Sequence, residues 1–390
     1  MRDLLTFCET AQPWLRSTIE SLVRIESPTT DKRAVDACGA AVAALMREMG
    51  GAVEVIAQQK AGDHVRGVFA GPEGPRHHAE GPRHPRHRVL LLGHFDTVWP
   101  IGQLARMPLV EREGKLFGPG IFDMKGGLAI ALQALRALAH AGWPAGLEVI
   151  CLWTSDEETG SDTSRALLER DALASKAVLV FEPALAGGAV KTARKGVGQF
   201  DVHVTGVSAH SGIDPGSGAS AVHALAALVR SLEALNDPAR GISVNVGVIR
   251  GGSRSNVVAE TAEAEVDVRV AQAEDAPRLD RALHALSSGD PRITVRVSGS
   301  IDRPPFERTD AVAAVYDTAR RVAADLGFEL GEGATGGASD GNFTGALGVP
   351  TLDGLGAAGG GAHALDEHVE IAQLPRRAAL AAGLLRRLVE

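Results

Sequence analysis

The chain has 390 residues, a formal net charge of −8, 45% hydrophobic residues and 23% charged residues. This length exceeds what one hydrophobic core usually serves, so it predicts two domains. The composition is that of a folded globular protein rather than a disordered one. Because basic residues are scattered along an acidic chain, nucleic acid and anionic membranes are not expected as partners.

The three cysteines, Cys8, Cys38 and Cys151, are too few and too widely spaced for a disulfide framework, which favours a reducing compartment. The first 23 residues alternate charged and apolar positions and lack the apolar stretch of a signal peptide. No segment approaches the ~20 apolar residues that a membrane helix needs. We therefore expect a cytoplasmic protein.

Helices are predicted at 15–24 and 33–49, where apolar residues recur at intervals of three and four, and a strand is expected at 52–56. Residues 71–88 are rich in Pro, Gly, His and Arg and contain an imperfect repeat of GPRH. Histidines in this segment have almost no acidic partners, so a solvated hairpin loop is a better interpretation than a metal site. These histidines are His77, His78, His84 and His87.

Apolar runs follow at 89–98, 147–158 and 177–183, with a helix predicted at 130–142. Such short apolar runs are typical of buried parallel strands. Their alternation with helices predicts an α/β sheet covered on both faces. Helices at 310–326 and 373–388 would complete this domain.

The central part of the chain has a different pattern of apolar and polar residues. Strands that alternate apolar and polar residues and two amphipathic helices are expected there, in the order β-α-β-β-α-β of a ferredoxin-like domain. The expected strands are 199–210, 242–252, 257–272 and 292–299, and the expected helices are 219–235 and 277–286. We predict an α+β domain at 196–304, inserted into a discontinuous α/β domain formed by 1–195 and 305–390.

Acidic and imidazole side chains follow the apolar runs. Sites in open α/β sheets form beyond the carboxyl ends of the strands, and zinc binds imidazole and carboxylate when no thiolate is offered. A carboxylate between two ions can bridge them. We therefore predict a centre of two zinc ions in which His94 binds one ion, Asp123 bridges, and Glu158 binds the first or the second ion. Glu182 and His363 are the remaining ligands.

Two further carboxylates have predicted roles. Asp96 lies two residues after His94, on the same side of an extended strand, and can accept a hydrogen bond from the ring nitrogen that is not bound to metal. Glu157 is placed to take a proton from the attacking water and to pass it to the leaving amine. The alternative is a structural histidine and a solvated Glu pair at a helix start, but several such groups would then have to gather by chance.

The stretch GPGIFDMKGG, residues 118–127, also suggests a phosphate-binding loop. It lacks the Gly-Lys-Ser/Thr ending and the spacing of such a loop, so we discard this interpretation.

The motifs GHFDTV, GPGIFDMKGG, TSDEETGS, FEP, SAHSG, GGSRSNVV and GGGAHALDEHVEI occur in this order along essentially the whole chain. In this pattern the chain resembles the co-catalytic zinc aminoacylase and carboxypeptidase family, and most closely its glutamate carboxypeptidase type. The resemblance implies a zinc-peptidase α/β catalytic domain with an inserted ferredoxin-like dimerisation, or lid, domain. It also implies that His94 and Glu182 complete one zinc site and Glu158 and His363 the other, around Asp123.

The resemblance implies roles for the inserted domain as well. His210 of SAHSG would reach the active site of the partner in a homodimer and stabilise the oxyanion. Asn256, Arg269 and Arg303 would contact the substrate carboxylate or its surroundings, since an arginine can hold a carboxylate with two parallel bonds. Without the resemblance, His210 would be interpreted as a surface residue and Arg269 equally well as an exposed strand charge.

The predicted function is cleavage of a C-terminal peptide bond or an N-acyl amino acid amide bond by two zinc ions, with cobalt or manganese as substitutes. The partners expected are a small peptide or N-acyl amino acid and a second copy of the chain. The glycine-rich stretch before His363 lacks large side chains, which argues against a strict glutamate preference. An aminoacylase or amidohydrolase acting on N-acyl or N-carbamoyl amino acids is one alternative, and a catalytically inactive binding homologue is another.

Overall fold

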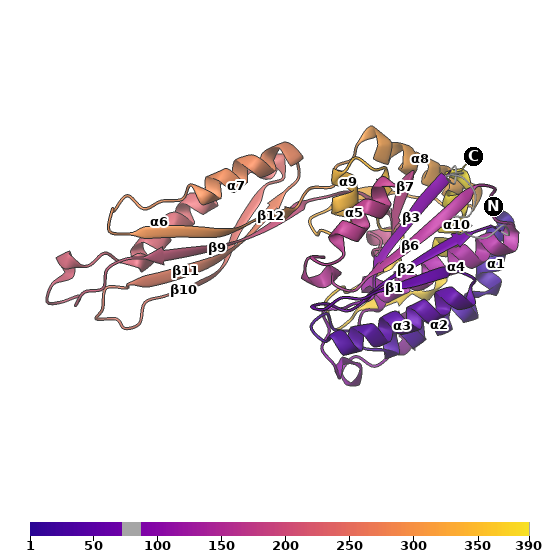
Figure 1. Cartoon of the computed structure of the whole chain (residues 1–390), viewed down its shortest axis with the longest axis horizontal. Coiled ribbons are helices and arrows are strands. Elements are labelled where there is room, and N and C mark those ends of the chain that lie inside the picture. The colour runs from indigo at the N-terminus through magenta and orange to yellow at the C-terminus, as the bar shows by residue number, and fades with distance from the viewer. Residues whose placement is uncertain (72–86, 390) are drawn as a thin grey trace. The chain divides into compact units, whose positions relative to one another are not determined.

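The computed structural model describes residues 1–71 and 87–389, and they form two compact units (Figure 1). The first unit comprises Met1–Thr192, Arg308–Ala334 and Ser339–Glu390, and the second comprises Ala193–Glu307 and Thr335–Ala338. The boundaries predicted from the sequence were 196 and 304, and nothing in the sequence indicated that 335–338 returns to the second unit.

A six-stranded sheet lies at the centre of the first unit, in the order β1-β2-β6-β3-β7-β14. Strands β6, β3, β7 and β14 run parallel, whereas β1 and β2 form an antiparallel edge. The parallel strands therefore have their carboxyl ends at one edge of the sheet. The bounds are β1 (Ala52–Ile56), β2 (His64–Ala70), β3 (His87–His94), β6 (Leu147–Thr154), β7 (Ala177–Val180) and β14 (Thr351–Leu352).

Helices cover both faces of this sheet, as the apolar runs predicted. Leu91 and Trp153 point to one face, and Leu90 and Leu152 point to the other, because side chains alternate along a strand. The first face packs against α1 (Arg2–Thr10), α2 (Gln12–Arg24), α3 (Lys32–Glu48), α4 (Gly126–Ala141), α8 (Asp310–Asp325) and α10 (Leu374–Arg387). The second packs against α5 (Arg165–Leu173) and α9 (Gly341–Ala346).

The structure also has two small sheets that the sequence did not predict. One has the order β15-β16-β5-β4, and in it β16 pairs with β5, so residues distant in the chain lie side by side. The other pairs β8 with β13. The bounds are β4 (Val110–Arg112), β5 (Lys115–Phe117), β8 (Val190–Arg194), β13 (Glu332–Thr335), β15 (Gly359–Gly360) and β16 (His368–Glu370).

The second unit is a four-stranded antiparallel sheet in the order β10-β11-β9-β12, with two helices on one face. Val202, Leu225 and Leu279 belong to its separate hydrophobic core. The chain order β-α-β-β-α-β and this strand order are those of a ferredoxin-like domain, which confirms the predicted fold class. The bounds are β9 (Gly196–Thr205), α6 (Ala221–Glu233), β10 (Ser243–Gly251), β11 (Thr261–Val270), α7 (Ala276–His284) and β12 (Thr294–Arg303).

Most of segment 71–88 lies outside the described residues, so the predicted hairpin loop and its histidines stay untested, except that His87 and Arg88 begin β3. Among the residues described, no helix is long and apolar enough to span a bilayer. Cys8, Cys38 and Cys151 are buried free thiols.

Candidate metal centre

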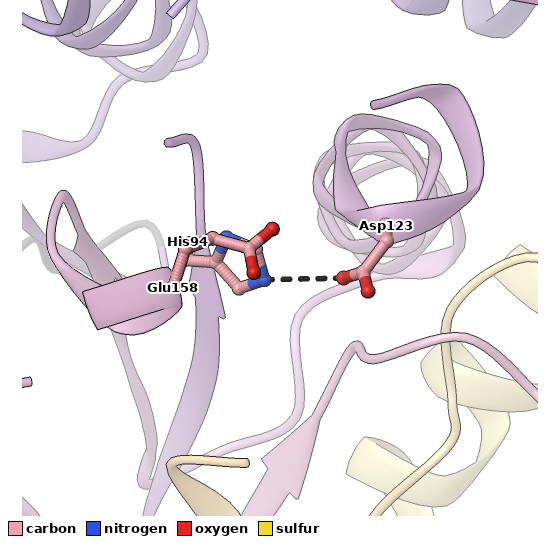
Figure 2. A group of neighbouring side chains, drawn as sticks. All are labelled: His94, Asp123 and Glu158. Carbon is pink, nitrogen blue, oxygen red and sulfur yellow. Dashed lines mark hydrogen bonds and ion pairs between the residues drawn. The ribbon is translucent and has the colours of Figure 1, made fainter. Parts of the chain in front are cut away.

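Three adjacent parallel strands carry the predicted ligands to one edge of the central sheet. His94 is the last residue of β3, Glu158 follows β6 and Glu182 follows β7. Since β6 and β7 pair with β3 on its two sides, their carboxyl ends bring these side chains together. Asp123 arrives from the turn before α4, and Figure 2 shows it facing His94 with Glu158 beside them. The sequence prediction that these residues converge agrees with this geometry.

The two carboxylate oxygens of Asp123 face two different histidines. The Oδ1 atom lies 3.2 Å from Nε2 of His94, and Oδ2 lies 3.4 Å from Nε2 of His363. The same His94 nitrogen is 3.5 Å from Oε1 of Glu182, and the same His363 nitrogen is 3.4 Å from Oε2 of Glu158. The five side chains thus form two groups that share Asp123.

The donor atoms fit divalent metal ions. Ligands bound tetrahedrally at ~2.0–2.1 Å from zinc lie about 3.3 Å from one another, which is close to the distances between these atoms. His94, Asp123 and Glu158 each offer an atom within 4.8 Å of the others. The Oε1 atom of Glu158 is buried, and it accepts no hydrogen bond from any residue that the structure describes. A buried carboxylate oxygen without a donor is costly unless a cation approaches it, so this atom favours a metal site.

Asp96 supports His94 and Glu158 from behind. Asp96 is fully buried, and its Oδ1 atom lies 3.4 Å from Nδ1 of His94. The same Nδ1 atom lies 3.1 Å from the backbone oxygen of Asp96. Its Oδ2 atom accepts hydrogen bonds from the hydroxyl of Thr29 at 2.7 Å and from the backbone N–H of Glu158 at 3.2 Å. These contacts fix the ring of His94 with Nε2 directed at Asp123.

The electrostatics of the cluster reflect its concentrated negative charge. Burial lowers the pKa of His94, but hydrogen bonds with Asp123, Asp96 and Glu182 outweigh burial and raise it well above its usual value. Contacts with Asp123 and Glu158 raise the pKa of His363 to about 10. Burial raises the pKa of Glu158. These shifts show that the surrounding carboxylates favour positive charge at this site, and divalent metal ions would supply such charge.

Glu157, the predicted base, begins the short 3-10 helix Glu157–Thr159 and is half-buried. It is adjacent in the chain to Glu158 but does not belong to the group of close donor atoms formed by His94, Asp123 and Glu158. Its role as the base stays a prediction.

Glycines allow the segments around the centre to approach closely. A Cβ atom on Gly127 would lie 2.0 Å from the backbone oxygen of Phe181, which precedes Glu182. A Cβ atom on Gly356 would lie 2.1 Å from the same oxygen, and the N–H of Gly356 donates to the oxygen of Glu182 at 2.9 Å. Gly127 of GPGIFDMKGG and Gly356 therefore allow close packing next to the cluster.

The other predicted site residues, His210, Asn256, Arg269 and Arg303, lie in the second unit. His210 is exposed, and its Nδ1 atom accepts backbone hydrogen bonds from Gly212 at 3.1 Å and Ile213 at 3.2 Å. Its ring therefore carries its proton on Nε2. The backbone oxygen of Asn256 accepts from the N–H of Ser211 at 3.1 Å, next to His210.

The two predicted arginine clamps have different surroundings. Arg269 is half-buried, and its guanidinium forms two parallel hydrogen bonds with Asp267, at 2.8 and 2.7 Å. Residues two apart on a strand share a face, so this pairing follows from the VDVRV sequence itself. Arg303 is buried at the end of β12.

Glu367 is a residue that the sequence analysis missed. It is fully buried, and its carboxylate accepts hydrogen bonds from the backbone N–H groups of Gly120, Phe122 and Asp123. It also accepts one from the indole of Trp99. The sequence gives no sign of this role, because an acidic residue between Asp366 and His368 is typical of a surface position.

Comparison with known proteins gives the family. The model of peptidase family M20/M25/M40 matches residues 90–387, a span that includes every member of the cluster. The chain therefore belongs to this family of metallopeptidases, and it is a hydrolase by that membership. This confirms the resemblance drawn from the motifs.

Particular relatives narrow the comparison. Carboxypeptidase G2 of Pseudomonas sp. is 32% identical over 384 residues, which cover 96% of this chain and 89% of that protein. Acetylornithine deacetylase of Proteus mirabilis is 31% identical over 210 residues, covering 50% of this chain and 53% of that protein. The crystal structure of the aminopeptidase PepT from Bacillus cereus superposes with a TM-score of 0.78 at 19% identity, covering 97% of this chain and 99% of that one. This last likeness shows a shared fold.

Proposed function

We propose that the chain is a two-metal hydrolase that cleaves a C-terminal peptide bond or the amide bond of an N-acyl amino acid, in the manner of a glutamate carboxypeptidase. The observation that carries the proposal is the position of Asp123, whose two oxygens face His94 and His363 at 3.2 and 3.4 Å. A carboxylate with one oxygen directed to each of two donor groups is suited to bridging two cations.

The ligands divide into two sets around this bridge. His94 and Glu182 would hold one ion with Asp123, and His363 and Glu158 would hold the other. Imidazole and carboxylate donors without thiolate suit zinc, with cobalt or manganese as substitutes. When bound, two such ions supply Lewis acidity to the scissile carbonyl and to the attacking water.

The residues of the chain then move the protons. Glu157 takes a proton from the water as it attacks the amide carbonyl carbon, and it delivers that proton to the amine nitrogen as the C–N bond breaks. Asp96 keeps the ring of His94 oriented throughout, since Thr29 and the backbone N–H of Glu158 both hold its Oδ2 atom and leave Oδ1 facing the ring at 3.4 Å.

A second copy of the chain would complete the site. The resemblance to the family implies a homodimer through the inserted domain, in which His210 of one subunit donates a hydrogen bond to the carbonyl oxygen at the other subunit's centre. The two backbone bonds to Nδ1 of His210 support this role, because they leave the Nε2–H group as a donor. Sedimentation should therefore give about twice the formula mass of 40.6 kDa. A monomer at micromolar concentration would contradict this part of the proposal.

The substrate carboxylate is assigned to Asn256, Arg269 and Arg303. The guanidinium of Arg269 is already paired with Asp267. It would hold the substrate carboxylate with the N–H groups that do not bond Asp267, or it would orient neighbouring donors. Replacing Arg269 by Lys should raise KM more than it lowers kcat if the guanidinium contacts the substrate in the ground state. An unchanged KM would remove Arg269 from the substrate site.

The experiment that tests the function is a substrate panel with metal analysis. N-acyl-glutamates and glutamyl-terminated dipeptides should be hydrolysed by protein that carries two ions per chain, and Glu157→Gln should keep both ions while losing ~10²–10⁴-fold in turnover. Near-normal turnover in Glu157→Gln with both ions bound would refute the assignment of the base. Protein without metal, whose hydrolysis is not restored by zinc or cobalt, would instead favour an inactive binding homologue.

A second candidate substrate class is supported by the 31% identity to an acetylornithine deacetylase. In that case the same centre would remove the acyl group of an N-acyl or N-carbamoyl amino acid whose side chain is not glutamate. N-acetyl and N-carbamoyl derivatives of basic, apolar and acidic amino acids separate the two candidates. A carboxypeptidase of the glutamate type should prefer the acidic amino acid within each series of derivatives.

A further inference from the structure

We propose that Glu367 is a positioning residue of the metal centre, which sets the distance between Asp123 and His363. The inference rests on the proposed metal site and adds to it a residue that contacts neither ion. Four hydrogen-bond donors from two segments converge on its carboxylate, which is buried completely.

The first pair of bonds holds Asp123 itself. Oε1 of Glu367 accepts from the backbone N–H of Phe122 at 2.9 Å and from that of Asp123 at 3.0 Å. Fixing the amide nitrogen of Asp123 limits where its Cα atom lies, and so where its carboxylate points. Glu367 lies 244 positions after Asp123 in the sequence. The bond to the N–H of Asp123 is therefore a tertiary contact that helix α4 could not supply from its own residues.

The second pair of bonds extends the contact to both sides of the site. Oε2 accepts from the N–H of Gly120 at 2.9 Å and from Nε1 of Trp99 at 2.8 Å. Trp99 lies in the loop that follows Asp96, so this loop and the turn before α4 are tied to the same carboxylate. Both oxygens are thus fully engaged by donors, which compensates for burying the charge.

The turn that carries His363 ends at Glu367. The N–H of Ala364 donates to the oxygen of Gly361 at 2.8 Å, and the N–H of Glu367 donates to the oxygen of Ala364 at 3.1 Å. The N–H of Gly118 donates to the oxygen of Glu367 at 3.2 Å. Because the same short turn holds Asp123 through its carboxylate and presents His363, a shift of Glu367 would separate two ligands of one ion.

The test compares metal binding by wild type, Glu367→Gln, Trp99→Phe, the double variant, and the control Glu370→Gln, a carboxylate three residues away on β16. Zinc affinity is measured by competition with a chromophoric chelator, and the melting temperature of each metal-free protein is recorded. Glu367→Gln should weaken zinc binding by ~10–100-fold, the usual effect of removing a partner behind a ligand, whereas Glu370→Gln should stay within about twofold.

The double variant separates positioning from general destabilisation. In Glu367→Gln the amide NH₂ replaces one carboxylate oxygen, so it faces two N–H donors although it is itself a donor. Trp99→Phe removes the indole N–H, so an NH₂ group in the place of Oε2 then faces only the N–H of Gly120. Trp99→Phe should therefore weaken zinc binding several-fold in the wild type and should be neutral or beneficial in Glu367→Gln. If Glu367→Gln does not fold, Trp99→Phe alone should still lower zinc affinity with the metal-free melting temperature within about 2 °C of the wild type.

Two results would overturn the inference: unchanged zinc affinity in Glu367→Gln, or the same loss from Trp99→Phe in both backgrounds. Unchanged affinity in Trp99→Phe would overturn it where Glu367→Gln does not fold. A wild-type protein that binds no zinc would instead refute the proposed metal centre.

Discussion

Replacement of Gly127 by alanine tests whether close packing of α4 against the end of β7 holds the centre together. The added Cβ atom would lie 2.0 Å from the oxygen of Phe181 and 3.1 Å from its carbonyl carbon. Both contacts are with backbone, so no side-chain rotation can relieve them, and the helix or the strand end must move by more than about 1 Å. Overpacking typically costs ~1–3 kcal/mol, and a backbone clash belongs at the upper end of that range.

Helix propensity acts in the opposite direction, since alanine is favoured over glycine inside a helix by about 1 kcal/mol. The net expectation is a loss of about 2 kcal/mol in the free energy of unfolding. The assay is thermal or urea unfolding of metal-free protein, with Gly289→Ala as the control, because a Cβ atom there meets no neighbour within 4 Å. Zinc binding should weaken too, since Glu182 follows Phe181. A Gly127→Ala protein as stable as the control would refute the reasoning.

Three further predictions follow from the cluster and the core. Asp123→Asn should abolish binding of both ions, whereas Glu182→Gln should weaken the binding of one ion more than that of the other. Native mass spectrometry counts the bound ions, and an Asp123→Asn protein that keeps both ions would contradict the bridging role of Asp123. Removal of metal by a chelator should lower the melting temperature, because ions at a hundredfold excess over Kd stabilise the native state by about 2.7 kcal/mol, and unaltered melting would argue against a resident metal. Burial raises the pKa of Cys8 to about 12 and also raises those of Cys38 and Cys151, so at pH 8 a thiol reagent should label the native protein far more slowly than the unfolded one. Rapid labelling of any of the three would contradict their burial.

The predictable part of the fold is the part with strong periodicity. The apolar runs that became β3, β6 and β7 are buried on both faces, so their composition alone distinguishes them from the alternating strands of the second unit. Helix α5, RALLERDAL, was missed because charges interrupt its apolar spacing. Strand β2 was missed because Gly67 interrupts its run of β-formers.

The convergence of the cluster was predictable where the proposed ligands follow strands. His94, Glu158 and Glu182 stand at the carboxyl ends of adjacent strands, and topology alone brings them together. Glu367 was not predictable, because its partners are backbone N–H groups up to 247 positions away, and sequence does not display backbone donors. The pairing of Arg269 with Asp267 could have been anticipated from their spacing on one strand face.

A crystal structure of zinc-loaded protein, with anomalous scattering, would show directly whether Asp123 bridges two metal ions. We expect two zinc peaks about 3.5–4 Å apart, one beside His94 and Glu182 and one beside His363 and Glu158, with an oxygen of Asp123 on each. A single peak, or two peaks of which Asp123 contacts only one, would contradict it.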